Sequence, residues 1–379
     1  MPHPGSVDFN QAPFLVIWET TQACDLSCTH CRAAAQPLRD PGELSTDEGK
    51  RLLAETAAMG TPVFILSGGD PVKRPDLCEL IRHGKSVGLR MGTIPAATMA
   101  LTEELVKQLK DTGLDQMALS LDFPRPEQHD AFRGVPGAYA KTMQAIEWAH
   151  RYELPLQINT TICGRSLPYF REIAELVERL GIVFWEVFFL VPVGRGEALG
   201  GLTAEECEAV FEIIYDVQKR NSFVVKVTEA PHYRRYVAQR EAEAQRPGHP
   251  GATLPKMLQV SEGPGHTVGL APRGVNAGQG FAFVSHTGEV YPSGFLPLMA
   301  GNVRTQGLAD IYRNSPLFRE LRNPDLLLGR CGRCEYRRIC GGSRSRAYAL
   351  CGSYLATDPW CSYEPAAVEQ PGEAAHSLA

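Results

Sequence analysis

Short apolar segments and amphipathic segments follow one another along the first part of the chain. Runs rich in β-branched and aromatic residues predict strands, and they lie at 14–19, 62–67, 89–94, 116–122, 155–162 and 183–191. Apolar residues at helical spacing between these runs predict helices, near 45–59, 75–87, 102–112, 138–151, 167–180 and 203–219. This order predicts an α/β fold with a parallel sheet and helices outside it. The periodicity alone fits a β/α barrel and a doubly wound open sheet equally well.

The pattern changes after residue 220. A charged helical stretch near 231–246 is followed by Pro- and Gly-rich sequence, which predicts a connector. Residues 281–295 predict a β-hairpin that turns at Thr287–Gly288, with a helix near 307–323 after it. We therefore expect five segments along the chain: an extension at 1–13, a β/α domain at 14–220, a connector at 221–280, a second domain at 281–365 and a disordered tail at 366–379.

Composition and charge narrow the class of protein. Of the 379 residues, 44% are hydrophobic and 21% are charged, which allows a large core. The formal charge of −5 gives no electrostatic reason to expect nucleic acid or an anionic membrane as a partner. The chain has no apolar run close to the roughly 20 residues of a membrane span, and its first residues lack the pattern of a secretory signal. These features predict a cytoplasmic protein.

Eight of the eleven cysteines lie in two short stretches, which favours metal binding over disulfides in a reducing compartment. Cys24, Cys28 and Cys31 follow the first predicted strand, at the edge of the sheet where α/β folds carry their chemistry. Structural zinc needs four ligands, and His30 fits as the fourth only by type, because adjacent residues in a tight loop point apart. A [4Fe–4S] cluster held by three thiolates leaves one iron open to a small molecule.

The spacing C-x3-C-x2-C after the first strand of a β/α array resembles the signature of the radical S-adenosylmethionine (SAM) superfamily. The resemblance implies that the open iron binds SAM and that an electron from the cluster cleaves it. The resulting 5′-deoxyadenosyl radical would abstract a substrate hydrogen. It also implies a partial (β/α)6 TIM-like barrel over 14–220, in preference to the doubly wound sheet, and an electron donor such as a flavodoxin or a ferredoxin.

The same resemblance implies SAM contacts at the ends of later strands. Gly-Gly-Asp closes the second strand, where members of the superfamily carry a Gly-Gly-Glu-like motif, and by itself it is also an ordinary turn. Polar residues at the ends of the fourth and fifth strands and an arginine after the sixth match other contact positions. The expected cofactor-binding residues are Gly68, Gly69, Asp70, Ser120, Asp122, Asn159 and Arg195. No residue is singled out as a catalytic acid or base.

The second cysteine group begins C-x2-C-x5-C, a spacing that also suits a zinc ribbon. Beside a radical SAM barrel it resembles a SPASM domain, the C-terminal extension that holds auxiliary [4Fe–4S] clusters. No cysteine lies between Cys207 and Cys331, so the resemblance implies one auxiliary cluster rather than two. Its expected ligands are Cys331, Cys334, Cys340 and Cys361. Cys351 is the competing candidate for the fourth.

Two stretches, TQACDLSCTHCRA and CGGSRSRAYA, resemble the radical SAM enzymes of heme and heme d1 biosynthesis. This resemblance implies a tetrapyrrole substrate whose propionate side chains are removed or decarboxylated. Guanidinium groups suit carboxylates, and the candidate arginines are Arg133, Arg195, Arg344 and Arg346.

Two alternatives stay open. One is maturation of a ribosomal peptide. The 13 residues before the first predicted strand argue against a built-in leader-binding domain but not against a separate one. The other is a non-catalytic iron–sulfur or zinc protein.

Overall fold

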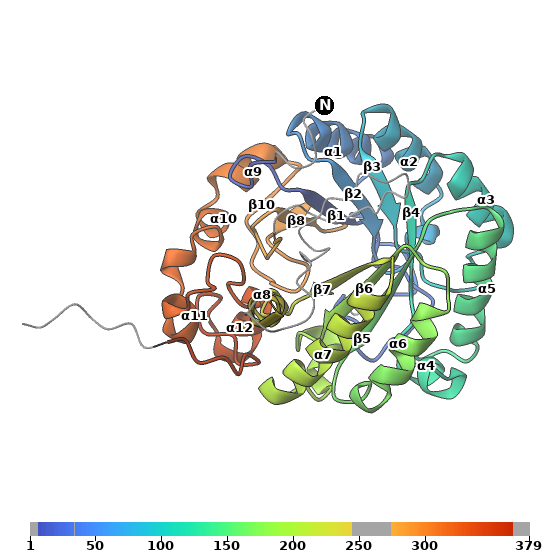
Figure 1. Cartoon of the computed structure of the whole chain (residues 1–379). Coiled ribbons are helices and arrows are strands. Elements are labelled where there is room, and N and C mark those ends of the chain that lie inside the picture. The colour runs from blue at the N-terminus through green and yellow to red at the C-terminus, as the bar shows by residue number, and fades with distance from the viewer. Residues whose placement is uncertain (1–6, 34, 245–273, 367–379) are drawn as a thin grey trace, which may run out of the picture.

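The computed structural model describes residues 7–33, 35–244 and 274–366 (Figure 1). A parallel sheet curves through the molecule, and six of its strands are those that the apolar runs predict. They are β1 (Leu15–Glu19), β2 (Val63–Ser67), β3 (Arg90–Thr93), β4 (Gln116–Ser120), β5 (Leu156–Ile162) and β6 (Phe184–Phe189), in that spatial order. The predicted α/β fold with a parallel sheet is confirmed, and a partial TIM-like barrel is consistent with it.

Helices cover the outer face of the sheet, as Figure 1 shows. The expected ones are α1 (Thr46–Ala58), α2 (Leu77–Ser86), α3 (Glu103–Asp111), α5 (Ala138–Arg151), α6 (Phe170–Glu178) and α7 (Ala204–Arg220). Their boundaries have local causes: Ser45 caps α1 in a capping box with Glu48. The helix α4 (Pro126–Arg133) was not expected; Pro126 starts it and Gly134, at φ 72°, ends it.

The interval 221–280 differs from the expected connector. It contains β7 (Val224–Thr228), which pairs in parallel with β6 and adds a seventh strand to that edge of the sheet. The helix α8 (Tyr233–Ala244) confirms the charged helical stretch. The Pro- and Gly-rich part of the predicted connector, 245–273, lies outside the described residues, as does 367–379 of the predicted tail.

The C-terminal part continues the same sheet. The predicted hairpin forms between β8 (Phe281–Val284) and β9 (Glu289–Tyr291), and β10 (Gly301–Asn302) follows. On its other side β8 pairs in parallel with β1, which places the hairpin at the far edge from β7. The helix expected at 307–323 is broken before Pro316, which has no N–H to donate, into α9 (Leu308–Asn314) and α10 (Pro316–Leu321). Two short helices complete this part, α11 (Gly329–Arg333) and α12 (Arg344–Cys351).

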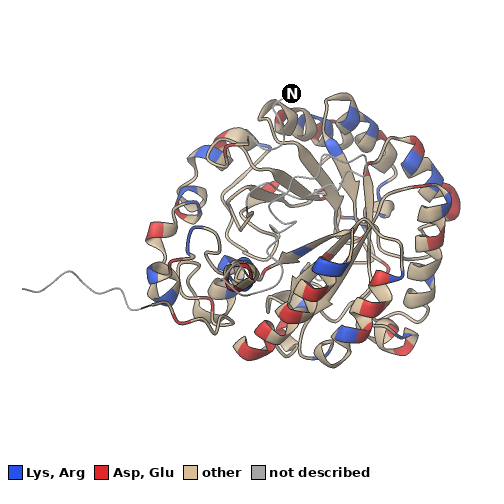
Figure 2. Cartoon of the chain, in the orientation of Figure 1, with Lys and Arg blue, Asp and Glu red and all other residues tan. Residues whose placement is uncertain are grey.

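Apolar side chains of the strands and helices form the main core, with Trp18, Phe64 and Trp185 fully buried. Charged residues colour the outer helices in Figure 2 and are sparse on the strands. Among the helices in the described ranges, none has the length and apolar character needed to cross a bilayer.

Candidate functional site

The three-cysteine loop leaves the carboxyl end of β1. Cys28 is buried, and Cys24 and Cys31 are half-buried. The backbone turns tightly there, with Cys31 N donating to Cys28 O at 3.2 Å. Burial is the main cause that raises the pKa of Cys24 to about 12, and nearby Asp70, Cys28 and Cys31 act in the same direction. Iron would have to displace the protons of these thiols on binding.

The Gly-Gly-Asp turn after β2 packs directly against the segment that leads into this loop. Gly69 N donates to Thr21 O and Asp70 N to Ala23 O, both at 2.7 Å. A Cβ on Gly69 would lie 2.5 Å from the Ala23 carbonyl oxygen, which is backbone and cannot move aside. The second glycine is thus required by the close approach of two chain segments, whatever else binds there.

The carboxylate of Asp70 joins its own turn to the segment that follows β3. It accepts hydrogen bonds from Val72 N, Ala96 N and Thr98 Oγ1 at 3.1–3.2 Å. Burial outweighs these donors and raises the pKa of Asp70 to about 6. Its side chain therefore orders the turn, and the backbone is the part of this residue that stays closest to the cysteine loop.

Arg133, at the end of α4, joins Asp122 to the cysteine loop. It donates to the Asp122 carboxylate, and its Nη1 lies 3.8 Å from the sulfur of Cys28. Although burial alone would raise the pKa of Asp122, the charge of Arg133 and a bond from Thr161 N hold it below its usual value. From the sequence, Asp122 is expected to bind the cofactor and Arg133 the substrate. In the structure the two side chains form one buried unit.

Two other expected contact residues lie near this unit on the strands. Ser120 on β4 is in register with Asn159 on β5. The Asn159 side-chain oxygen accepts a hydrogen bond from Gln157 Nε2 at 2.6 Å. The structure thus brings the ends of β4 and β5 together as expected from their parallel pairing.

Arg195 lies in the short helix η4 (Gly194–Ala198) and donates its backbone N–H to Cys31 O at 3.1 Å. Within the described ranges, its buried Nε and Nη2 atoms have no hydrogen-bond partner. A half-buried guanidinium with two buried, unpartnered nitrogens fits an anionic group bound beside the cysteine loop.

His30 packs on an aromatic ring beside the loop. Its ring stacks on Phe132, with ring centroids 4.3 Å apart. Among the residues that the structure describes, no three His, Cys, Asp or Glu side chains converge as a single-ion site would require. The arrangement thus gives no support to zinc held by the loop and His30.

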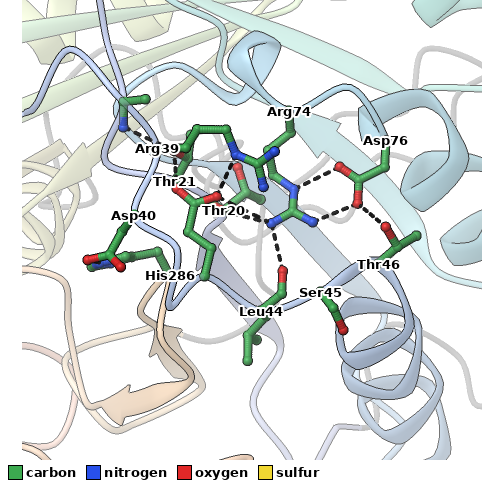
Figure 3. A network of polar contacts seen from close by, with 12 residues as sticks. Thr20, Thr21, Arg39, Asp40, Leu44, Ser45, Thr46, Arg74, Asp76 and His286 are labelled. Atoms are coloured by element: carbon green, nitrogen blue, oxygen red, sulfur yellow. Dashed lines mark hydrogen bonds and ion pairs between the residues drawn. The ribbon is translucent and has the colours of Figure 1, made fainter.

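A polar network that the sequence did not predict holds the start of the cysteine loop, just after β1 (Figure 3). Arg74 donates to the carbonyls of Thr20 and Leu44 at 3.2 and 2.9 Å. Its other nitrogens grip Asp76 at 2.6–2.9 Å. Thr20 directly follows β1, so this buried arginine fixes the point where the chain leaves the sheet. Because arginine at a strand-to-helix turn is common on surfaces, the sequence carries no signal for this role.

The four expected auxiliary ligands line one small cavity beside α8. They are Cys331, Cys334, Cys340 and Cys361. Cys351 is exposed at the end of α12 and does not line this cavity. Two of the sulfurs that line the cavity accept hydrogen bonds from backbone N–H groups. Asp358 N donates to Cys331 and Gly342 N donates to Cys340, both at 3.4 Å. Four thiols facing one space, with donors that favour thiolates, suit a four-iron cluster.

Two of the arginines expected to bind substrate carboxylates, Arg344 and Arg346, instead bind groups of the chain itself. Arg346 is fully buried and forms an ion pair with Asp358. Arg344 is also buried, and its Nη1 donates to the carbonyls of Tyr354 and Ala356 at 2.7 Å. Arg133 is committed to Asp122. These arginines hold the fold together, because guanidinium groups buried this deeply need partners from the chain itself.

Family models match both parts of the chain. The model described as radical SAM superfamily matches residues 18–177, and the model of the SPASM iron–sulfur cluster-binding domain matches residues 276–335. A relative from Methanosarcina barkeri, named AdoMet-dependent heme synthase, is 40% identical over 95% of this chain and 99% of its own length. A relative of the same name from Oleidesulfovibrio alaskensis is 42% identical over 94% of this chain and 89% of its own. The chain belongs to the radical SAM superfamily.

More distant relatives differ in their named activities. An Fe-coproporphyrin III synthase of Methanosarcina barkeri is 29% identical over 92% of this chain and 87% of its own length. A PqqA peptide cyclase of Rhodopseudomonas palustris is 28% identical over 93% and 88%. The crystal structure of Streptococcus suis SuiB bound to S-adenosylmethionine superposes with a TM-score of 0.69 at 16% identity, over 93% of this chain and 78% of that one. Membership makes this chain an enzyme and implies iron–sulfur clusters and SAM.

A partly open cavity of about 830 Å³, here called the barrel cavity, is lined by strands of the sheet and by the C-terminal part. Its volume is within the size range of ligand-binding sites. Part of its wall is apolar, with Phe184, Phe188 and Phe283. A polar ladder crosses β5 to β7 on the same wall. Glu186 on β6 accepts from Gln157 at 2.9 Å and pairs with Lys226 at 2.8 Å.

Proposed function

We propose that this radical SAM enzyme acts on the propionate side chains of an iron tetrapyrrole, in heme or heme d1 type biosynthesis. The observation that carries the proposal is the 40–42% identity, over nearly the whole chain, to relatives named AdoMet-dependent heme synthase. The size of the barrel cavity and its aromatic wall support a large planar substrate.

In this proposal Cys24, Cys28 and Cys31 hold a [4Fe–4S] cluster with one open iron. SAM bound at that iron supplies the one-electron chemistry that removes a hydrogen atom from the substrate. The cofactor-binding residues stay those expected from the sequence: Gly68, Gly69, Asp70, Ser120, Asp122, Asn159 and Arg195. The unpartnered guanidinium of Arg195 supports an anionic group beside the loop.

The chain's own residues would fix and shield these groups. Arg133 orients Asp122 and donates toward the Cys28 sulfur, so that it sets the position of the end of β4 against the cluster loop. The apolar wall with Phe184 and Phe188 would exclude water from the reacting side chain. One auxiliary [4Fe–4S] cluster at Cys331, Cys334, Cys340 and Cys361 completes the proposal, and the lining of their common cavity supports it.

The test is turnover by anaerobically reconstituted protein. It should consume SAM in the presence of a reductant and convert iron coproporphyrin III to products that have lost CO2, detected by mass spectrometry. A variant with Cys24, Cys28 and Cys31 replaced by alanine should do neither. SAM consumption that leaves every iron tetrapyrrole carboxylate unchanged would contradict the substrate assignment.

Peptide modification is the second candidate, and the 28% identical PqqA peptide cyclase favours it. The two candidates separate in one assay, in which the same protein receives either the iron tetrapyrrole or a small peptide encoded beside its gene. A mass change of the peptide alone would decide for the second candidate.

A further inference from the structure

The barrel cavity is lined by five cationic side chains, of which three are neutralised by carboxylates. Arg32 pairs with Glu19 at 2.6 Å. Lys226 pairs with Glu186 on the wall itself, and Arg338 pairs with Asp325 near the surface. These three cations need no further anion.

The other two, Arg234 and Arg322, have no such partner among the described residues. Arg234 donates to the carbonyls of Ile339 and Val275. Arg322 donates to the carbonyls of Tyr312 and Arg313, at 2.7 and 3.2 Å. Each guanidinium has five N–H groups, so these bonds leave donors to spare on both.

Neither arginine is paired with a carboxylate of this wall within the described residues. Burial lowers the pKa of Arg322, as expected for a cation taken out of water. Asp8 also lines the cavity, and its charge partly opposes the lowering of the Arg322 pKa. In the described part of the chain, however, Asp8 and Arg322 form no ion pair. The other carboxylates of the wall, Glu186, Glu229 and Glu241, contact neither arginine within that part.

Both arginines reach toward the segment before β8, Arg234 from the first turn of α8, which follows the carboxyl end of β7. Val275, the partner of Arg234, precedes the amino end of β8, and Tyr312, the partner of Arg322, receives a hydrogen bond from Gly280 N in the same segment. Strand β8 runs parallel to β1, whose carboxyl end leads into the cysteines. The amino end of β8 and the cysteine loop are thus on opposite edges of the sheet. In Figure 1, α8, which carries Arg234, lies between β7 and α12.

We propose that Arg234 and Arg322 form a carboxylate-binding subsite that anchors unreacted carboxylates of the substrate beside the segment before β8. The inference rests on the proposed function, because a tetrapyrrole with several propionates can present one to the cysteine end while the others are held. Bidentate binding by two fixed guanidinium groups would set which side chain reacts. In this proposal Arg234 and Arg322 take the carboxylate-binding role for which the sequence suggested other arginines.

The experiment compares two probes on the same macrocycle, one with free carboxylates and one with uncharged methyl esters. Iron coproporphyrin III and its tetramethyl ester are titrated by visible absorbance into holoenzyme with SAM, for the wild type and for Arg234→Met, Arg322→Met and the double variant. Each single substitution should weaken binding of the acid about 10-fold and leave binding of the ester unchanged. Arg234→Lys and Arg322→Lys should recover part of the preference for the acid.

Arg319→Met is the matched control. Arg319 lies on α10, donates to the same Arg313 carbonyl at 3.2 Å, and does not line the cavity. Its substitution should change neither affinity. A purely structural role for Arg234 or Arg322 would weaken acid and ester alike, and equal loss would overturn the subsite.

Three further outcomes are informative. Unchanged preference for the acid in the double variant overturns the subsite but leaves the proposed function standing. Failure of the wild type to bind the acid while it still cleaves SAM overturns both. A shift in which propionate reacts first, seen by mass spectrometry in either methionine variant, supports the subsite independently.

Discussion

Arg346 and Asp358 form a two-point ion pair, with Nε to Oδ1 at 2.9 Å and Nη2 to Oδ2 at 2.8 Å, and neither side chain reaches solvent. The pair links α12 to the segment that carries Cys361. Asp358 also accepts a bond from Ser343 N at 2.8 Å and donates its own N–H to the Cys331 sulfur. One buried interaction thus fixes two of the four cysteines that line the C-terminal cavity.

Breaking the Arg346–Asp358 pair should reduce the iron bound at the four C-terminal cysteines more than the iron bound at the cysteine loop after β1. In Asp358→Asn the buried Arg346 charge loses its partner, a change that costs about 3–5 kcal/mol of stability. We expect a lower unfolding temperature and about half of the iron of the wild type after anaerobic reconstitution. Asp111→Asn is the control, because it breaks a pair with Lys107 on the outer helix α3, in which both side chains are about half exposed or more and which should contribute little. Equal iron in both variants would contradict this role of Asp358.

The choice between Cys361 and Cys351 can be decided by iron counting. Two four-iron clusters imply about eight irons per chain. Cys361 lines the cavity with the other three cysteines, whereas Cys351 is exposed. Cys361→Ala should therefore lose about half of the iron and sulfide, and Cys351→Ala should lose none. The opposite result would move the fourth ligand to Cys351.

What the sequence predicted depended on local pattern. Buried parallel strands are short apolar runs, so β1 to β6 were found within a residue or two. Strand β7 was missed because its five residues, Val224–Thr228, are flanked by a charged helix and by polar sequence. That β8 pairs with β1, across more than 260 residues, leaves no trace in either segment.

The candidate site also contains features that are local in sequence and features that depend on tertiary contacts. Cysteine spacing and the paired glycines are local, so their positions could be read. Which residue an arginine binds is decided by tertiary contacts: Arg133 meets Cys28 across 105 residues of sequence. The sequence therefore indicated candidate arginines, but it could not show that Arg344 and Arg346 are engaged by groups of the chain itself.

Arg133 should matter for the radical SAM cluster rather than for the substrate. Arg133→Met would leave the buried carboxylate of Asp122 unpaired and remove a donor from the Cys28 sulfur. We expect at least 10-fold weaker SAM binding, measured by the change in the cluster's electron paramagnetic resonance spectrum. Arg125→Met, which breaks an exposed pair with Glu172 just before α4, should bind SAM as the wild type does. Wild-type SAM affinity in Arg133→Met would rule out this role.

The close approach of Gly69 to the cysteine loop predicts a steric effect. In Gly69→Ala the new methyl group would meet the carbonyl oxygens of Ala23 and Gln22 at 2.5 and 2.6 Å, so the backbone before Cys24 must shift. Iron at the first cluster and SAM cleavage should both fall at least several-fold. Gly200→Ala meets nothing within 4 Å and serves as the control. A fully active Gly69→Ala enzyme would show that the loop tolerates displacement.

The contact between His286 and Glu19 predicts a pH dependence of stability. Their Nδ1 and Oε2 atoms lie 3.2 Å apart and join the β8–β9 turn to the end of β1. The hydrogen bond to Glu19 raises the pKa of His286 above 6.5 despite partial burial. Although burial alone would raise the pKa of Glu19, the bond to His286 and the Arg32 charge hold it below 4.5.

Because the folded-state pKa of the histidine is raised, its contribution to stability is complete below pH 6.5 and is lost as pH rises through that pKa. The glutamate contributes above pH 4.5 and is lost as pH falls, so the pair stabilises most between pH 4.5 and 6.5. His286→Gln should therefore lower the unfolding temperature at pH 6 by about 1–2 °C more than at pH 8.5. His150→Gln, whose ring bonds the Leu180 carbonyl and no carboxylate, is the control and should show no such difference. If the two variants have parallel pH profiles, the His286–Glu19 contact does not govern the docking of the hairpin on β1.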